Sequence, residues 1–545
     1  MSIILDLLKS NRNDELWQLC CGFLDWDADQ FMRIQNNLLL EQIELLKKSY
    51  LGLKVMKGAR PTSVEDFRNN VPLTRYIDYC PELLEQNPDV LPAKPVRWIQ
   101  TSGKGGVYPF KWVPVSQRQW DESGLNFAAI GLLGSCHKKG EMGLKPGMKF
   151  LYAASQSPTL TGTVAYKIAS EVGIRFMPNL IDAEKLSFDD RVQIGYKRAL
   201  SEGMDGFYGL AGVLAAIGKK FEEGSRTSNK AAFWKQPGAL LRISRGLIRS
   251  KSQGRGLLPK DLWDLKLIIS MGTDATVFKD RINHLWGRMP LNIYGNTETI
   301  VAATQTWDYK DLVFFPNLNY FEFIPEDELI KENQINSYHP RTVLLSELEK
   351  GKFYELVITN LHGGALARYR LGDLIRVSAL RNEALGINLP QITLEGRTDD
   401  LIDLGFIRLN ERVIWEGLEK TEIRYKDWTA IKEIEGNPQL HLYLELAPGY
   451  YISSEEVAKR LYYTIKNLSN GLYVYKEIDK IDTLIDFKPI KVTILPQGTF
   501  SAYKRARQSE GATLTDLKPP HVNPSRDDLG LLAPSSVSGD RTLVS

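Results

Sequence analysis

The chain has 545 residues, of which 43% are hydrophobic and 25% charged, and its 69 basic residues nearly balance 66 acidic ones. Because this length exceeds what one hydrophobic core usually spans, we expect at least two domains. A net charge of +3 argues against a nucleic-acid partner, since such proteins normally carry a strong basic excess or a basic stripe.

Cysteine and histidine usage indicates neither a disulfide framework nor a metal site. The cysteines Cys20, Cys21, Cys80 and Cys136 form no Cys-x-x-Cys pair, and the six histidines show no metal-ligand spacing. The N-terminus lacks a basic region followed by a long apolar run, and no stretch approaches the roughly 20 apolar residues of a membrane span. We therefore expect a cytoplasmic protein with no membrane partner.

The first three hundred or so residues predict an α/β fold. Residues 1–55 have apolar positions at helical spacing, which favours helices packed on a core. A short strand is predicted for 95–100, and from there to about residue 300 apolar strand-like runs alternate with helical patterns. This alternation is typical of layered α/β subdomains with largely parallel strands.

The composition changes twice further along the chain. Residues 310–395 are rich in predicted strands and suggest a β-rich, barrel-like part, so we assign 1–396 to one large N-terminal domain. Residues 397–520 mix strands and helices and predict a small α+β domain. Residues 521–545 are rich in Pro, Ser, Asp and Gly, which predicts a disordered tail.

A glycine-rich segment at 100–116, QTSGKGGVYPFKWVPVS, is the first candidate site. Its glycines allow backbone amides to approach a polyanion, and its hydroxyl and lysine side chains can bind phosphates. These residues are Thr101, Ser102, Gly103, Lys104, Gly105, Gly106 and Lys111. The common phosphate-loop spacing is absent, so a plain turn is the alternative interpretation.

A second candidate lies at 291–305, LNIYGNTETIVAATQ, where a predicted strand ends in a glycine turn and a polar cluster. Glu298 is a natural Mg²⁺ ligand, because Mg²⁺ binds one or two carboxylates together with phosphate oxygens and waters. Thr297 can donate to a phosphate oxygen, and Tyr294 offers a flat face for adenine. The alternative is a strand end followed by a helix-capping threonine.

Three further segments carry charged residues at strand ends and near the predicted domain boundary. In RYRLGD, Asp373 can accept hydrogen bonds from both hydroxyls of a ribose, and Arg368 and Arg370 either pair with phosphates or cover the barrel surface. The alternative is a β-turn with Gly-Asp at its corner.

In EGRTDD (395–400), Arg397 can reach a ribose or a phosphate, and Asp399 lies at the boundary between the two predicted domains. The Asp-Asp pair can equally cap a following helix or turn. Near the end of the small domain, Lys518 and Lys504 are candidate active-site lysines, with a solvated surface position as the alternative for either.

Taken in order, these motifs resemble the acyl-acid amido synthetases, the auxin-responsive Gretchen Hagen family of the adenylate-forming superfamily. The resemblance extends over about residues 65–520 and includes FRNNVPLTRYIDYCPELLEQ (67–86). It implies a large adenylate-forming domain, a small mobile C-terminal domain, and the cofactors ATP and Mg²⁺. The implied nucleotide-binding residues are Thr101, Ser102, Gly103, Lys104, Gly105, Tyr294, Gly295, Asn296, Thr297, Asp373 and Arg397. The implied catalytic residues are Lys518, Lys111 and Glu298, with Glu298 as the metal ligand and Asp399 as the hinge.

The family chemistry is ATP-dependent activation of a carboxylic acid to an acyl adenylate, followed by transfer to an amine, often of an amino acid. The expected partners are thus a small carboxylic acid and an amine or thiol acceptor, in a monomer or weak dimer. One alternative is a ligase that uses coenzyme A or a carrier thiol. The basic stretch 241–260 is then a candidate binding site for the phosphorylated nucleotide tail. Another is a non-catalytic ATP-binding relative, because Lys104 and Gly105 replace the family's hydroxyl residues.

Overall fold

The computed structural model describes residues 2–101, 111–224, 237–271, 278–335, 337–397, 402–403, 408–435, 437–467, 490–509 and 519–533. The chain divides into two compact units, the first made of 1–371 with 375–394 and the second of 372–374 with 395–545. Within the described residues, no helix combines the length and the apolar character needed to cross a bilayer.

The first unit begins with helices, as the periodicity of residues 1–55 predicts. They are α1 (Ile3–Lys9), α2 (Asn13–Cys21), α3 (Ala28–Lys47), α4 (Tyr50–Val55) and α5 (Val64–Asn70). Short 3-10 helices lie at Gly22–Asp25, Tyr76–Tyr79 and Pro88–Val90, and another lies further along the chain at Leu345–Glu347. The inward face of α3 includes the buried Leu39 and Ile43, and also Gln35, whose amide bonds the backbone of Asn319 and Phe321. Helix α3 therefore packs on strand β10 (Asn319–Pro325) through both apolar and polar contacts.

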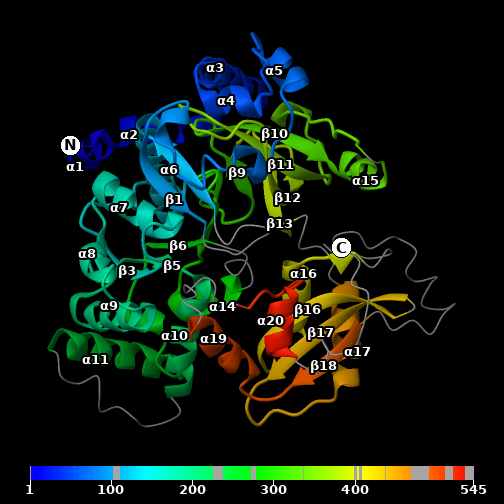
Figure 1. The fold of residues 1–545 in the computed structure, drawn as a ribbon. Coiled ribbons are helices and arrows are strands. Elements are labelled where there is room, and N and C mark those ends of the chain that lie inside the picture. Colours follow the sequence, from blue (N-terminus) through cyan, green and yellow to red (C-terminus); the bar gives the residue numbers. More distant parts are fainter. Residues whose placement is uncertain are drawn as a thin grey trace. The chain divides into compact units, whose positions relative to one another are not determined.

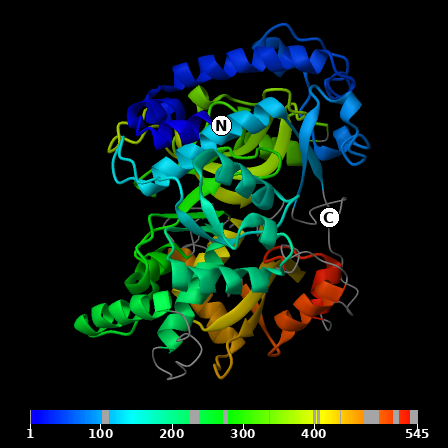
Figure 2. The same cartoon turned by 90° about the vertical axis from the view of Figure 1, so that its left-hand side faces the viewer.

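A mixed sheet forms the centre of the first unit (Figures 1 and 2). Among the described residues it has the strand order β10-β11-β12-β13-β9-β8-β7-β6-β5-β3-β4. Its parallel half consists of β3 (Lys149–Ala153), β4 (Arg175–Met177), β5 (Gly206–Gly209), β6 (Leu267–Met271) and β7 (Leu291–Tyr294). The predicted α/β layering with parallel strands is therefore confirmed.

Helices cover both faces of this parallel half. Phe150 and Tyr152 of β3 join the core under α6 (Gln117–Ser135) and α7 (Leu160–Val172), whereas Leu151 and Ala153 join a second core. That second core involves α9 (Phe188–Glu202), α10 (Ala211–Gly224), α11 (Pro237–Ser252), α12 (Pro259–Leu262) and α14 (Lys279–Trp286), and the short α8 (Leu180–Ala183) follows β4. Successive strand residues point to opposite faces, so a strand between two helix layers is apolar throughout.

The predicted β-rich part continues the same sheet in antiparallel fashion. Its strands are β8 (Ala303–Gln305), β9 (Leu312–Phe314), β10, β11 (Phe353–Asn360), β12 (Tyr369–Ala379) and β13 (Gln391–Arg397), with α15 (Glu326–Gln334) after β10. The pairs β7–β8, β8–β9, β9–β13 and β10–β11 are antiparallel. Strands β1 (Pro95–Gln100) and β2 (Trp112–Ser116) form a separate antiparallel pair.

The second unit is built on a small sheet. Strand β17 (Asn437–Leu446) pairs antiparallel with β16 (Tyr425–Glu435) and parallel with β18 (Ile490–Leu495), and β14 (Ile402–Asp403) pairs with β15 (Arg408–Leu409). Its helices are α16 (Glu411–Lys420), α17 (Ser454–Asn467), α19 (Thr499–Ser509) and α20 (Arg526–Leu532). The mixture of strands and helices agrees with the predicted α+β character.

The predicted tail differs from the structure over its first part. Residues 526–532 form α20, which Ser525 caps by accepting a hydrogen bond from the backbone of Asp528. Leu529 and Leu532 are buried with Phe500 and Tyr503. Composition alone is therefore misleading here, because a few apolar residues at helical spacing suffice to pack a short helix; residues 534–545 lie outside the described residues.

Candidate functional site

Two residues joined by hydrogen bonds, Thr101 and Lys111, flank the glycine-rich part of the first candidate segment. Strands β1 and β2 are antiparallel, and beyond their last pair Thr101 faces Lys111. The Thr101 amide donates to the Lys111 carbonyl at 2.9 Å, and the Lys111 amide donates to Thr101 Oγ1 at 2.9 Å. The predicted phosphate-binding residues between them, Ser102, Gly103, Lys104 and Gly105, lie outside the described residues.

Lys111 and Glu298, predicted from separate motifs, lie together. The Lys111 ammonium is 3.5 Å from Glu298 Oε1, and the two side chains are 24% and 11% exposed. The ammonium also lies 5.5 Å from the ring centre of Tyr76 and 5.9 Å from that of Tyr369. A cation over aromatic faces and beside a carboxylate is held electrostatically more strongly in such a semi-buried place than in water.

Tyr369 is a site residue that the sequence reasoning missed. Lys111 Nζ donates to its hydroxyl at 3.2 Å, and the hydroxyl donates to Glu298 Oε1 at 3.4 Å. Tyr369 is flanked by Arg368 and Arg370, which attracted attention as candidate phosphate ligands. Because strand side chains alternate in direction, Tyr369 at the start of β12 faces away from Arg370, the next residue of the strand.

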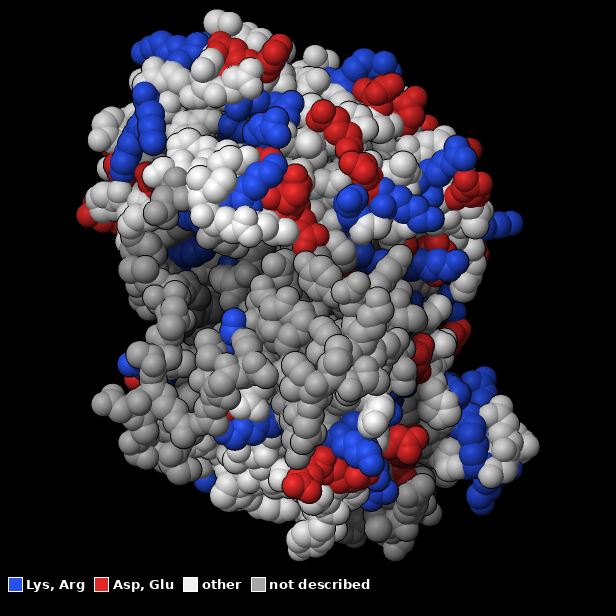
Figure 3. Space-filling model, turned by 90° about the vertical axis from the view of Figure 1, so that its right-hand side faces the viewer, with Lys and Arg blue, Asp and Glu red and all other residues white. Residues whose placement is uncertain are grey.

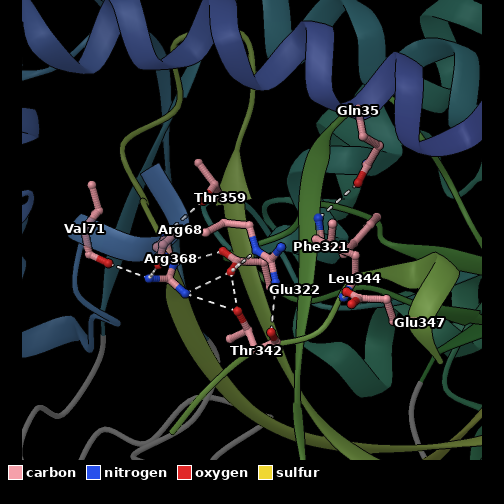
Figure 4. A network of polar contacts seen from close by, with 10 residues as sticks. All are labelled: Gln35, Arg68, Val71, Phe321, Glu322, Thr342, Leu344, Glu347, Thr359 and Arg368. Carbon is pink, nitrogen blue, oxygen red and sulfur yellow. Dashed lines mark hydrogen bonds and ion pairs between the residues drawn. The ribbon is translucent and has the colours of Figure 1, made fainter. Parts of the chain in front are cut away.

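The two arginines have structural partners instead. Arg368 forms a bidentate ion pair with Glu322 at 2.9 and 3.1 Å and also bonds Thr342 and the carbonyls of Arg68 and Val71 (Figure 4). Arg370 pairs in the same way with Glu355 and Glu332. Both arginines are buried, so neither covers a surface, and these carboxylates already engage the donors that a phosphate would need.

Glu298 is positioned by the turn that follows β7. A Cβ on Gly295 would lie 2.6 Å from the Ile300 carbonyl, so the tight approach requires glycine at this place. The side-chain oxygen of Asn296 accepts from the Thr299 amide at 2.9 Å, and Asn360 donates to the Glu298 carbonyl at 2.8 Å. The neighbouring Tyr294 and Thr297 are buried, so the predicted polar cluster is a hydrogen-bonded turn with part of its side chains covered.

The carboxylate of Glu298 fits a Mg²⁺ ion whose other ligands are nucleotide phosphate oxygens and waters. Among the described residues, no group of three or more His, Cys, Asp or Glu side chains is arranged to enclose a metal ion. A single, mostly buried carboxylate suits Mg²⁺ because this ion keeps several waters and takes phosphate oxygens rather than an all-protein cage.

The predicted ribose ligands also lie together, in the second unit. Arg397 Nη1 is 3.3 Å from Asp373 Oδ1, and Asp373 is buried on β12 whereas the Arg397 side chain is 44% exposed. The carboxylate therefore has a cationic neighbour near the end of β13. The predicted hinge Asp399 and the predicted lysine Lys518 lie outside the described residues, and the rival Lys504 is 3.8 Å from Asp427.

The basic stretch 241–260 corresponds largely to α11. Figure 3 shows a group of Lys and Arg side chains without acidic neighbours at the lower right, where α11 projects. Arg242 bonds the Leu200 carbonyl and Arg255 pairs with Asp261, so part of the stretch is structural. Elsewhere on this face, basic and acidic side chains are interspersed.

Comparison with known proteins gives two family matches on this chain. The GH3 family N-terminal domain matches residues 22–183 and the GH3 family central domain matches residues 312–397. A jasmonoyl–L-amino acid synthetase GH3.5 from Oryza sativa subsp. japonica is 27% identical over 298 residues, which are 50% of this chain. The match spans 48% of that relative, about half of its length.

Solved structures share the fold over most of the chain. The AtGH3.15 acyl acid amido synthetase in complex with 2,4-DB superposes with a TM-score of 0.66 at 17% identity, covering 94% of this chain and 95% of that one. A 2-hydroxyisobutyryl-CoA ligase in the postadenylation state has a TM-score of 0.56 at 15% identity and covers 88% and 93%. The two domain matches thus identify GH3 family domains over residues 22–183 and 312–397, and the solved structures show that the chain has the fold of these enzymes.

Proposed function

We propose that this protein uses ATP to convert a carboxylic acid into an acyl adenylate and then transfers the acyl group to an amine. The observation that carries the proposal is the cluster of Lys111, Glu298 and Tyr369, which come from three separate motifs of the sequence. The name of the rice relative, a jasmonoyl–L-amino acid synthetase, supports an amino acid as the amine.

The chemistry needs two anions held side by side. A carboxylate oxygen attacks the α-phosphorus of ATP, the bond from that phosphorus to the bridging oxygen breaks, and pyrophosphate leaves with the electron pair. The amine then attacks the acyl carbon, AMP leaves, and the ammonium loses a proton. Positioning supplies most of the acceleration in such transfers, because little covalent chemistry falls to the protein.

Lys111 is suited to offset the charge of the phosphates. Its ammonium is already held, partly buried, beside two aromatic rings and one carboxylate, so little reorganisation is needed when an anion arrives. Mg²⁺ would be held by Glu298 and, when bound, would neutralise phosphate charge. Tyr369 holds the lysine and the carboxylate in a fixed relation.

The remaining assignments follow the family pattern. We assign the phosphates to Thr101, Ser102, Gly103, Lys104 and Gly105, the adenine to the turn at Tyr294–Thr297, and the ribose to Asp373 and Arg397. Asp399 is proposed as the hinge between a large domain (1–396) and a small domain (397–520). Lys518 is proposed to reach the reacting phosphate during adenylation.

A thiol acceptor is the second candidate. The basic α11 favours it, because Arg245, Arg249 and Lys251 are exposed and can attract a phosphorylated carrier such as coenzyme A. Coenzyme A consumption that falls with added salt and with Arg245→Glu/Arg249→Glu would support this acceptor, whereas amino-acid-dependent release of AMP would support the amide.

The deciding measurement is acid-dependent ATP–pyrophosphate exchange by the full chain with MgATP and a panel of aryl, indolyl and fatty acids. We expect exchange with one class of acid and a loss of about 100-fold or more in Glu298→Gln, since removing one preorganised charge contact typically costs this much. Glu41→Gln is the matched control, because Glu41 forms an exposed ion pair with Arg118. MgATP binding without exchange for any acid would contradict the proposal.

A further inference from the structure

Helix α11 of the first unit presents large apolar side chains to water. Leu241 is 55% exposed and Ile248 is 71% exposed, which is more than any other large aliphatic side chain among the described residues. They are seven residues apart, so they lie nearly on one line along the helix, about 10 Å from each other. Figure 2 shows α11, in green at the lower left, projecting from the first unit. Single apolar residues scattered over a surface are ordinary, but these two form a row on a projecting helix.

Basic side chains flank this row on both sides. At 3.6 residues per turn, Arg245 and Arg249 lie on one side of the row and Lys251 on the other. All three are exposed, and among the described residues none of them takes part in an ion pair. Residues 237–260 contain no Asp or Glu, and the next acid along the chain, Asp261, pairs with Arg255. The outward face of α11 is defined here as Leu241, Arg245, Ile248, Arg249 and Lys251.

The opposite side of the helix is packed on the first unit. Ala239, Gly246 and Ser250 are buried, and the guanidinium of Arg242 donates to the Leu200 carbonyl of α9. The helix is therefore held from one side only. A partner can reach the outward face but cannot surround the helix.

Helix stability does not explain this face. Cations in the last turn, such as Arg249 and Lys251, favour the negative end of the helix dipole, but this accounts neither for Arg245 nor for the exposed apolar row. A soluble polyanion such as coenzyme A would use the charges and leave the apolar side chains in water. A second copy of the same face would bring like charges together.

An anionic lipid bilayer uses both kinds of side chain at once. In a helix that lies in the plane of a membrane interface, the apolar side chains enter the boundary of the acyl chains. The long stems of Arg and Lys cover apolar surface while their charged ends reach the lipid phosphates. The expectation of no membrane partner came from the lack of a spanning segment, which an interfacial helix does not need.

We propose that the outward face of α11 binds the surface of an anionic membrane, with Leu241 and Ile248 inserted at the interface and the basic side chains on the headgroups. The proposed surface includes no residue of the cluster around Lys111 and Glu298. Membrane binding is thus an additional property, independent of the adenylation chemistry.

Co-sedimentation of the full chain with lipid vesicles tests the proposal. One set of vesicles is phosphatidylcholine alone, and the other contains about one third phosphatidylserine. We expect at least 10-fold tighter binding to the anionic vesicles at about 0.1 M salt, and most of it lost at about 0.5 M, because added salt screens the headgroup charge. No binding to the anionic vesicles, or equal binding to both sets, would overturn the proposal.

Charge neutralisation tests whether α11 is the binding element. We expect Arg245→Gln/Arg249→Gln to weaken binding by about 20-fold, since each basic residue beside an anionic bilayer contributes roughly fivefold to the affinity. The matched control is Arg118→Gln/Arg281→Gln, which changes the net charge equally at two exposed arginines that pair with Glu41 and Glu222. Equal losses in the two variants would overturn the assignment to α11.

The apolar row separates a membrane from other anionic partners. We expect Leu241→Ser/Ile248→Ser to weaken binding to the anionic vesicles by about 10-fold or more, because the inserted apolar surface is lost while every charge remains. Ile181→Ser, at another exposed isoleucine of the first unit, is the control and should bind like the unmodified protein. An unchanged thermal unfolding midpoint verifies that each variant is folded. Full binding by the Leu241/Ile248 variant would overturn insertion and indicate attraction by charge alone, as for coenzyme A or an acidic protein.

Discussion

Glu328 shows how a single side chain makes the stability of the first unit depend on pH. Its carboxylate accepts from the Arg341 amide at 2.9 Å, from Lys331 at 2.9 Å and from the Tyr338 hydroxyl at 2.7 Å. Burial opposes ionisation, but these hydrogen bonds outweigh it and lower the pKa of Glu328 from 4.5 to about 2.

A depressed carboxyl pKa stabilises the folded state above the unfolded pKa and loses that contribution as the pH falls toward the folded pKa. We therefore predict that the difference in free energy of unfolding between the unmodified protein and Glu328→Gln is constant above about pH 5. It should shrink as the pH is lowered from 4.5 toward 2. Urea unfolding at several pH values measures the difference, and a gap that widens in acid would contradict the assignment.

At the scale of elements, buried ion pairs join the antiparallel strands to the chain around α5. Arg368 has the left-handed φ of +47° just before β12, and its guanidinium bonds Glu322 of β10, Thr342 and two carbonyls near the end of α5 (Figure 4). Arg368, at the centre of these contacts, comes directly before Tyr369, the first residue of β12. The contacts that hold this end of the strand in the sheet therefore also orient a residue of the candidate site.

We predict that Arg368→Met lowers the free energy of unfolding by about 3–5 kcal/mol, because removing one partner leaves the Glu322 charge buried with fewer donors. The double variant Arg368→Met/Glu322→Met should cost less than the sum of the two single variants, by about 0.5–3 kcal/mol. Equilibrium urea unfolding of the three variants provides the test. Additive costs would show that the pair is not coupled.

At this scale, the features that depend on local sequence patterns were predictable, and those that depend on contacts between distant residues were not. The parallel strands were predictable, because apolar runs such as KFLYA alternate with helical patterns and are buried on both faces. Lys111 and Glu298 were proposed from their motifs, and the structure places their side chains 3.5 Å apart, whereas their roles stay predictions. The contact of Ile392 on β13 with Leu312 on β9 was not, since it joins residues far apart in sequence and has no local periodicity.

The missed features have physical causes. Tyr369 was passed over because charge drew attention to its neighbours, although alternation along β12 directs its side chain away from that of Arg370. Helix α20 was passed over because the Pro, Ser, Asp and Gly content of residues 521–545 outweighed its two buried leucines. In both cases the relevant signal was the spacing of side chains and not the composition.

For the whole molecule, the division into two units predicts separable stabilities. The first unit has its cores around the large sheet, whereas the second has a cluster of Tyr443, Leu495, Phe500, Tyr503, Leu529, Leu532 and Ala533. Asp528 adds polar contacts to the same cluster, through the Tyr503 hydroxyl at 2.7 Å and Arg507. Helix α20 is thus part of the core of the second unit.

We predict that ending the chain at Pro524, which removes α20, destabilises the second unit while leaving the first unchanged. Two leucines return to water, and full burial of each contributes about 1.5–3 kcal/mol, so the expected cost is about 3–6 kcal/mol before the contacts of Asp528 are counted. A chain ending at Ala533 retains α20 and is the control.

Hydrogen exchange resolved by peptide should show lost protection in β16–β18 and in α19 for the shorter chain alone, with β3–β7 protected equally in both. Equal protection of the second unit in both chains would mean that α20 does not stabilise it. Loss of protection that extends to β3–β7 would mean that the two units unfold as one.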